Sequence, residues 1–145
     1  MKRAGWLALI LFGATGNALA LPVNAACVVD STVQLANRTV QVRDCVQNGG
    51  LKRETFLEIC DLIANNEPEE GDAPNVTQME WCPAKPQAVC RTVLGQPISA
   101  HHYGRDAEGL AVAREKCVRG TGNGKARGKW LDCVANPGSC APATY

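Results

Sequence analysis

Eight cysteines constrain this chain more than any other feature of its sequence. No two of them are closer than seven positions, so the sequence lacks the Cys-x-x-Cys knuckles that are typical of zinc sites. Their even number on a chain that begins with the features of an export signal predicts a framework of four disulfides and no metal site. The cysteines are Cys27, Cys45, Cys60, Cys82, Cys90, Cys117, Cys133 and Cys140.

The first twenty residues have the three parts of a signal peptide. Lys2 and Arg3 are followed by an apolar run over residues 5–14, and small residues at 18 and 20 form a cleavage pattern. The apolar run is too short to cross a bilayer as a helix. We therefore predict a signal peptide over residues 1–20, with cleavage as late as Ala25, and a single domain over 21–145 that is periplasmic or secreted and has no transmembrane segment.

Lipid anchoring at Cys27 is an alternative to a free mature chain. Ala25 and Ala26 before Cys27 resemble the end of a bacterial lipobox, but Asn24 stands where that pattern requires an aliphatic residue. Lipidation would also leave an odd number of cysteines. The sequence favours a chain without an anchor.

Period-two alternation predicts the strands, and apolar residues at i, i+3, i+4 and i+7 predict the helices. Apolar residues alternate with polar ones on both sides of residues 36–38, which indicates a hairpin, and residues 77–81 form a short strand. A second hairpin is expected over 89–94 and 98–103. Apolar stripes predict helices over 51–64 and after Asp106, each with a cysteine on its buried face. The fold class is α+β: an antiparallel sheet of two hairpins and a short strand, with two helices packed on it.

The pairing of eight cysteines has 105 solutions, and the sequence does not select one. Proximity along the predicted elements suggests Cys133–Cys140 and Cys45–Cys60, with Cys82–Cys90 as a loop clip and Cys27–Cys117 as the remaining pair.

Two short motifs resemble functional sites and fail on inspection. Trp81-Cys82-Pro83 starts like a thioredoxin active site, but Lys85 occupies the position of the second cysteine. The glycine-rich run from Gly120 to Lys125 matches neither a phosphate-binding loop nor a dinucleotide fingerprint. No cofactor is predicted.

The remaining candidates are cations and a pair of histidines. Residues 119–129 form a basic, glycine-rich loop beside an aromatic residue, which suggests an anion-binding surface. His101 and Tyr103 share one face of a predicted strand and are candidates for the same contact, whereas His102 points the other way. The predicted binding residues are Arg119, Lys125, Arg127, Lys129, Trp130, His101 and Tyr103.

Charge is distributed unevenly along the chain. Residues 21–80 carry four Lys/Arg and ten Asp/Glu, a net charge of −6, whereas residues 81–145 carry nine and four, a net charge of +5. Such a bipolar chain either steers a charged partner or attracts itself within one fold; the second reading is the simpler one.

Three functions compete on this evidence. The first is a non-catalytic binding domain for a protein or polyanionic partner in the envelope, such as an enzyme inhibitor, with no specific nucleic-acid target. The second is a small secreted hydrolase that uses His101 or His102, and the third is a thiol-disulfide or electron-transfer accessory protein. The composition resembles that of small cysteine-rich proteins exported by Gram-negative bacteria, a likeness that assigns no residue a role.

Overall fold

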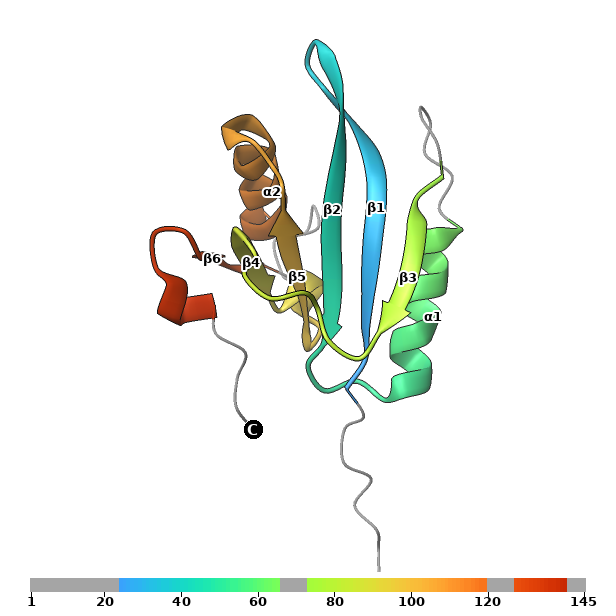
Figure 1. The fold of residues 1–145 in the computed structure, drawn as a ribbon. Coiled ribbons are helices and arrows are strands. Elements are labelled where there is room, and N and C mark those ends of the chain that lie inside the picture. Colours follow the sequence, from blue (N-terminus) through green and yellow to red (C-terminus); the bar gives the residue numbers. More distant parts are fainter. Residues whose placement is uncertain (1–23, 66–72, 120–126, 141–145) are drawn as a thin grey trace, which may run out of the picture.

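The fold is α+β, as the sequence predicts, with one antiparallel sheet and two helices (Figure 1). It is a computed structural model that describes residues 24–65, 73–119 and 127–140. The predicted signal peptide lies outside the described residues. None of the described helices is both long and apolar enough to cross a membrane.

The first half of the chain folds as hairpin, helix and strand. β1 (Ala26–Leu35) pairs with β2 (Arg38–Asn48), as their alternating apolar residues predict. α1 (Arg53–Ala64) buries Phe56 and Cys60, two members of the predicted apolar stripe. β3 (Asn75–Met79) then pairs with β1.

The second half repeats this order with shorter strands. β4 (Ala88–Arg91) leads through a 3-10 turn, η1 (Val93–Gly95), to β5 (Ile98–Tyr103), with which it pairs. α2 (Ala107–Arg119) follows, and β6 (Lys129–Asp132) pairs with β4 before a last turn, η2 (Pro137–Cys140). Asp106 accepts a hydrogen bond from the Gly109 amide at 2.8 Å, which confirms its predicted role as N-cap of α2.

The second half differs from the prediction in two ways. The strand expected over 89–94 ends at Arg91, because Thr92 and Leu94 adopt left-handed backbone conformations that a strand does not accommodate. β6 is a sixth strand that the sequence pattern does not predict, since its four residues are too few for a period-two signal.

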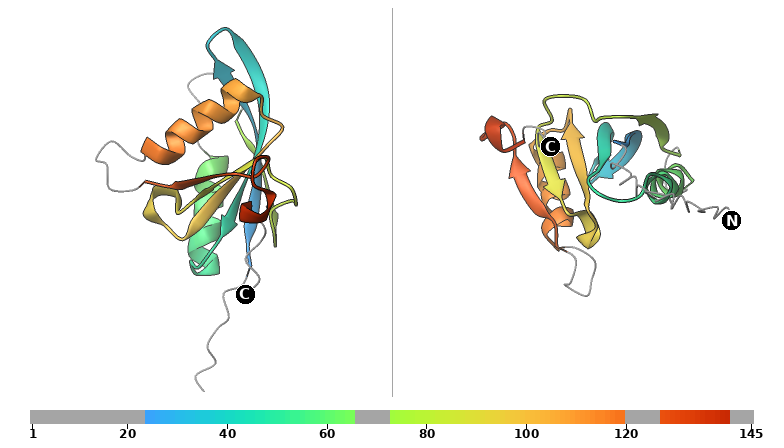
Figure 2. Two further views of the ribbon diagram at one scale, coloured as in Figure 1. Left: turned by 90° about the vertical axis from the view of Figure 1, so that its left-hand side faces the viewer. Right: turned by 90° about the horizontal axis from the view of Figure 1, so that it is seen from below.

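The two halves join through β2 and β5 at the centre of the sheet, whose order is β3-β1-β2-β5-β4-β6. Each half therefore contributes three strands, of which the first in sequence lies between the other two. The strand order of the second half is the mirror image of that of the first, with β2 and β5 adjacent at the centre. Both helices cover one face of the sheet, which we call the helix face (Figure 2). Residues 80–87, which connect β3 to β4, cross the opposite face, which we call the link face.

Two disulfides join a helix to the first strand of its half. Cys27 of β1 is bonded to Cys60 of α1, and Cys90 of β4 is bonded to Cys117 of α2. The predicted Cys27–Cys117 pair is therefore wrong. These equivalent bridges, one in each half, fix both helices against the sheet.

The other two disulfides lie away from the helices. Cys45 of β2 is bonded to Cys82 on the link face, so the predictions Cys45–Cys60 and Cys82–Cys90 are wrong. Cys45 lies opposite Val28 and next to Val46, whose side chain packs toward α1, so strand alternation turns Cys45 away from that helix. The predicted Cys133–Cys140 bridge is confirmed.

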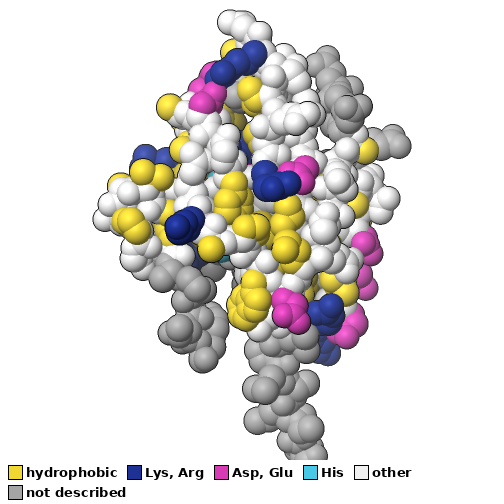
Figure 3. Space-filling view, viewed as in Figure 1, with side chains coloured by type: hydrophobic (Ala, Val, Ile, Leu, Met, Phe, Trp, Pro, Cys, Tyr) yellow, Lys and Arg dark blue, Asp and Glu magenta, His cyan; other side chains and the backbone are white. Residues whose placement is uncertain are grey.

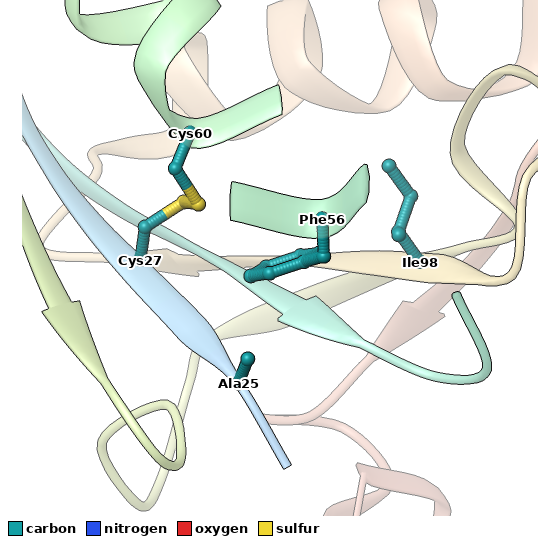
Figure 4. Close-up of a cluster of buried hydrophobic side chains, with 5 residues drawn as sticks. All are labelled: Ala25, Cys27, Phe56, Cys60 and Ile98. Carbon is teal, nitrogen blue, oxygen red and sulfur yellow. A yellow bond between two sulfur atoms is a disulfide. The ribbon is translucent and has the colours of Figure 1, made fainter. Parts of the chain in front are cut away.

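Apolar side chains are buried on both faces of the sheet. On the helix face, Phe56 packs beside the Cys27–Cys60 bridge with Ala25 and Ile98 (Figure 4). On the link face, Ala26, Val28 and Cys45 form a second cluster, against which Cys82 and Tyr103 pack. This second cluster fixes the 80–87 connection across the sheet.

Candidate functional site

The most buried group of polar side chains lies on the helix face where the two halves meet. Asp44 of β2 lies opposite His102 of β5 and accepts a hydrogen bond across 2.8 Å from its Nδ1. Arg105 donates to the same carboxylate through Nη2 at 2.6 Å and Nε at 3.2 Å. The side chains of His102 and Arg105 are only 9% and 8% exposed, so water does not replace these contacts.

Further contacts hold this group on all sides. The ring of Trp130 from β6 stacks on His102, with ring centroids 5.4 Å apart. Gln87 bonds both the backbone amide and the backbone carbonyl of Arg105, at 2.7 and 2.9 Å. Although burial alone raises the pKa of Asp44, the hydrogen bonds from His102 and Arg105 hold it below its ordinary value. The carboxylate is thus permanently charged and fully engaged, which is the arrangement of a structural ion pair between the two halves.

The neighbouring histidine has a different environment on the link face. His101 lies between Cys45 of β2 and Val89 of β4, and its Nε2 is 3.1 Å from the Ser99 hydroxyl. Its Nδ1 is buried and has no hydrogen-bond partner among the described residues. Burial, reinforced by the charges of His102 and Arg91, lowers the pKa of His101 to about 4. His101 is therefore a neutral imidazole at ordinary pH.

These contacts separate the parts that a serine hydrolase would combine. A catalytic histidine needs the nucleophile on one ring nitrogen and an orienting carboxylate on the other. Here the carboxylate, Asp44, contacts His102 on the helix face, and the hydroxyl, Ser99, contacts His101 on the link face. Neither histidine contacts both groups in the described structure.

Tyr103 has a structural contact on the link face. Its hydroxyl donates a 2.6 Å hydrogen bond to the carbonyl of Pro83, next to the Cys45–Cys82 bridge. Burial, with a smaller contribution from the charge of Asp44, raises the pKa of Tyr103 to about 12. The phenol therefore stays protonated and anchors the connection between β3 and β4.

The cysteine beside Trp81 is not available as a thiol in this structure. Cys82 is bonded to Cys45, and all eight cysteines lie in disulfides. A thiol-disulfide accessory protein would need one of these bridges to open.

A hollow on the described surface lies beside the first hairpin. It measures about 550 Å³, and its lining includes Asp30, Arg43 and Tyr103. The carboxylate of Asp30 accepts hydrogen bonds from Arg43 at 2.7 and 3.0 Å, so these two charges satisfy each other. We assign this hollow no ligand, because its charged groups are already paired.

The predicted cationic residues gather where α2 ends and β6 begins. Arg119 is the last residue of α2 and pairs with Glu115 at 2.7 Å. Arg127 and Lys129 are exposed on either side of Gly128. Lys125 lies outside the described residues.

Gly128 fixes the position of these cations. Its amide donates a 2.8 Å hydrogen bond to the carbonyl of Cys117, and a Cβ at this position would lie 2.5 Å from the sulfur of Cys90. Only glycine allows the backbone to approach the Cys90–Cys117 bridge so closely. The cations therefore project from a backbone that is clamped to a disulfide.

The sheet register adds a cation that sequence reasoning missed. Arg91 of β4 lies directly opposite Lys129 of β6, and both are exposed on the link face. Within the described structure, neither of them nor Arg127 forms an ion pair with a carboxylate. We call Arg91, Arg127 and Lys129 the cationic end. The period-two alternation of β4 could have placed Arg91 on the same face as Val89. Its cross-strand partner Lys129, however, lies on β6, which the sequence pattern does not predict.

The other predicted site residues are divided between the two faces. His101 and Tyr103 share the link face with Lys129, whereas Trp130 packs on the helix face against His102. Trp130 therefore lies on the opposite face of β6 from Lys129 and is not part of the cationic end.

No family model, curated protein or solved structure matches this chain.

Proposed function

We propose that this protein is an exported, non-catalytic binding domain that uses its cationic end to contact a protein or polyanionic partner in the cell envelope. Four disulfides are consistent with an oxidising compartment outside the cytoplasm. The polar groups that could perform chemistry contact one another instead, as the Asp44 network illustrates.

The cross-strand pair of Arg91 and Lys129 is the observation that carries this proposal. Residues in such a pair have Cβ atoms about 4.5–5.5 Å apart, and like charges there destabilise a sheet. The fold gains one contact here, the hydrogen bond that Arg91 Nη2 donates to the Ser139 carbonyl at 3.3 Å. An anionic partner would in addition neutralise both charges at once. Arg127 lies two residues from Lys129 and extends the same surface.

The proposal is tested by changing the cationic end and measuring retention on heparin as a salt gradient rises. The double variant Arg91→Gln/Lys129→Gln should elute at clearly lower salt than the wild type, because fewer counterions are released on binding. The matched control is Lys52→Gln/Arg53→Gln, which removes the same charge from exposed positions at the start of α1. Equal elution of both variants would refute a localised anion site.

A protein partner is tested with the same variants. Envelope extract is passed over the immobilised domain, and the captured proteins are compared between the wild type and both variants. A partner that the wild type and the Lys52→Gln/Arg53→Gln control retain, and that the Arg91→Gln/Lys129→Gln variant loses, is expected. A partner retained equally by all three would show that another surface binds it.

A further inference from the structure

The outer edge of β3 is the second unusual surface of this molecule, at the opposite end of the sheet from the cationic end (Figure 1). β3 pairs only with β1, so the backbone groups on its other side have no strand partner in the described structure. Four of its five residues are exposed. Such an edge is a template for one more strand.

β3 lacks the features by which proteins protect an edge strand. Its sequence, Asn-Val-Thr-Gln-Met, contains no charge, no proline and no glycine. The other edge strand, β6, is shorter, begins with Lys129 and ends with Asp132, and is contacted by η2. The two edges of the sheet therefore differ: β6 carries charged residues that disfavour pairing with another strand, whereas β3 carries none.

Carboxylates outnumber cations around the open edge of β3, where Lys52 and Arg53 at the start of α1 are the basic residues. α1, which packs against β3, carries Glu54, Glu58 and Asp61 on exposed positions, and Glu80 follows β3 directly. None of these four carboxylates forms an ion pair with any described residue. Acidic side chains are visible along this flank of the molecule in Figure 3.

The charge asymmetry of the chain therefore becomes a charge asymmetry in space. Among the described residues, the first half carries six carboxylates and four cations and forms the β3 end of the sheet, whereas the second half carries four carboxylates and eight cations and forms the β6 end. Internal attraction explains little of it, because Asp44 is the one acid of the first half that pairs with basic side chains of the second half in the described structure, those of Arg105 and His102. Asp30 pairs with Arg43 of its own half, and Glu54, Glu58, Asp61 and Glu80 face solvent or a partner.

Exposed apolar side chains lie at the end of the same strand. Met79 and Trp81 lie two positions apart and are 45% and 47% exposed. Met79 is paired with Ala26 and shares the link face with it. An added strand would thus meet apolar surface on the link face and the acidic helix α1 on the helix face.

We propose that the open edge of β3 binds an extended segment of a protein partner in which apolar residues alternate with lysine or arginine. Main-chain hydrogen bonds would hold the segment as a seventh strand, and alternation would direct its apolar side chains to Met79 and its cations toward α1. A second copy of this chain fits less well, because pairing two β3 strands would bring two acidic α1 helices together. This surface is separate from the cationic end.

The probe for this inference is a capped octapeptide in which lysine and valine alternate, carrying a fluorophore for anisotropy measurements. It should bind the wild type more tightly than a peptide of the same composition with its lysines and valines in two blocks. It should also protect the backbone amides of β3 from hydrogen exchange. Equal binding of the two peptides, or no binding, would overturn the inference, since only the alternating peptide presents its cations on one face of a strand.

Variants of the edge locate the site. Gln78→Lys places a charge on the exposed strand and should weaken binding of the alternating peptide about tenfold through like-charge repulsion. Gln78→Pro should abolish it, because the hydrogen bond of the Asn48 amide to Ala25 sets the alternation along β1 and β3 and turns the Gln78 amide to the open edge; unfolding of this variant is detected by circular dichroism, and Gln78→Lys then decides alone. Unchanged binding to a folded Gln78→Lys variant would overturn the assignment to β3.

Two controls separate this inference from its rivals. The Arg91→Gln/Lys129→Gln variant should bind the peptide as the wild type does, so failure of the cationic end as a binding site leaves this result unaffected. Light scattering on the peptide-free protein tests for self-association. A dimer that Gln78→Lys dissociates would identify a second copy as the occupant and overturn the proposal of a basic segment.

Discussion

Protonation of His101 should make the fold less stable in mild acid by an amount that the structure fixes. The pKa of His101 is lowered from about 6.5 to about 4, chiefly because its ring is buried and further by the charges of His102 and Arg91. Its buried Nδ1 has no hydrogen-bond partner among the described residues. Below pH 6.5 the unfolded chain binds a proton that the folded chain does not, so stability falls as pH drops toward 4. Each pH unit in this window costs about 1.4 kcal/mol, which gives about 2 kcal/mol between pH 7.5 and pH 5.

Urea unfolding of the oxidised protein at these two pH values measures the effect. With a denaturant slope of about 1–3 kcal/mol per molar urea, the midpoint should fall by about 1 M. His101→Phe fills the same space without a titrating group, so its loss of stability should be smaller by about 2 kcal/mol. Contributions from groups that titrate alike in both proteins cancel in this comparison.

A nuclear magnetic resonance titration gives an independent value. The chain has two histidines, and the imidazole signals missing in His101→Phe identify those of His101. They should titrate near pH 4. Titration near pH 6.5, or an equal loss of stability in wild type and variant, would refute the argument that His101 is buried and neutral.

Three further predictions concern the Asp44 network, the contact of Gly128 with the Cys90–Cys117 bridge, and the start of the domain. Asp44→Asn should destabilise the fold by about 3 kcal/mol, measured by urea unfolding, because it leaves the buried guanidinium of Arg105 without its counter-charge; a loss below about 1 kcal/mol would contradict the network. Gly128→Ala should cost about 1–3 kcal/mol, since its methyl group would meet the Cys90–Cys117 bridge, and an unchanged thermal midpoint would show that the clamp is loose. If the chain is exported, its mature N-terminus should be Leu21 and not Ala26, because Ala25 is buried and its carbonyl accepts hydrogen bonds from β2; intact mass decides between them.

The sequence predicts the elements of this fold better than their contacts. Alternation around residues 36–38 and the apolar stripe of α1 identify β1, β2 and α1, because each signal is local and strong. β6 is missed since four residues give almost no periodic signal, and its existence depends on pairing with β4, forty positions away. Long-range pairing of this kind is a tertiary effect that no local pattern contains.

The disulfides show the same limit. Cys133–Cys140 is predicted correctly because seven residues around a turn bring the two sulfurs together whatever the rest of the chain does. The other three pairings depend on which face of the sheet each cysteine occupies. Cys45 is one residue from a side chain that packs toward α1, and that single step sends it to the opposite face and to Cys82.

The candidate site was predicted in part for a related reason. Arg127 and Lys129 stand out in the sequence as members of a basic run, and both are exposed in the structure. Arg91 does not stand out, because its neighbours Cys90 and Thr92 give it no charged context. It becomes a candidate only when the register of β4 and β6 sets it opposite Lys129.

The position of the Cys90–Cys117 bridge explains how the fold tolerates this like-charge pair. Repulsion between opposed residues of one sign costs about 0.2–1 kcal/mol in a sheet. A bridge that joins residues 27 positions apart stabilises by about 3.5 kcal/mol on the loop-entropy account, several times more. The bridge lies next to Arg91 in the chain and touches the backbone beside Lys129 through Gly128, so its stabilisation acts where the repulsion arises. Reduction of this disulfide should therefore release β6 and disperse the cationic end before it unfolds the β1–β2 half, which has bridges of its own.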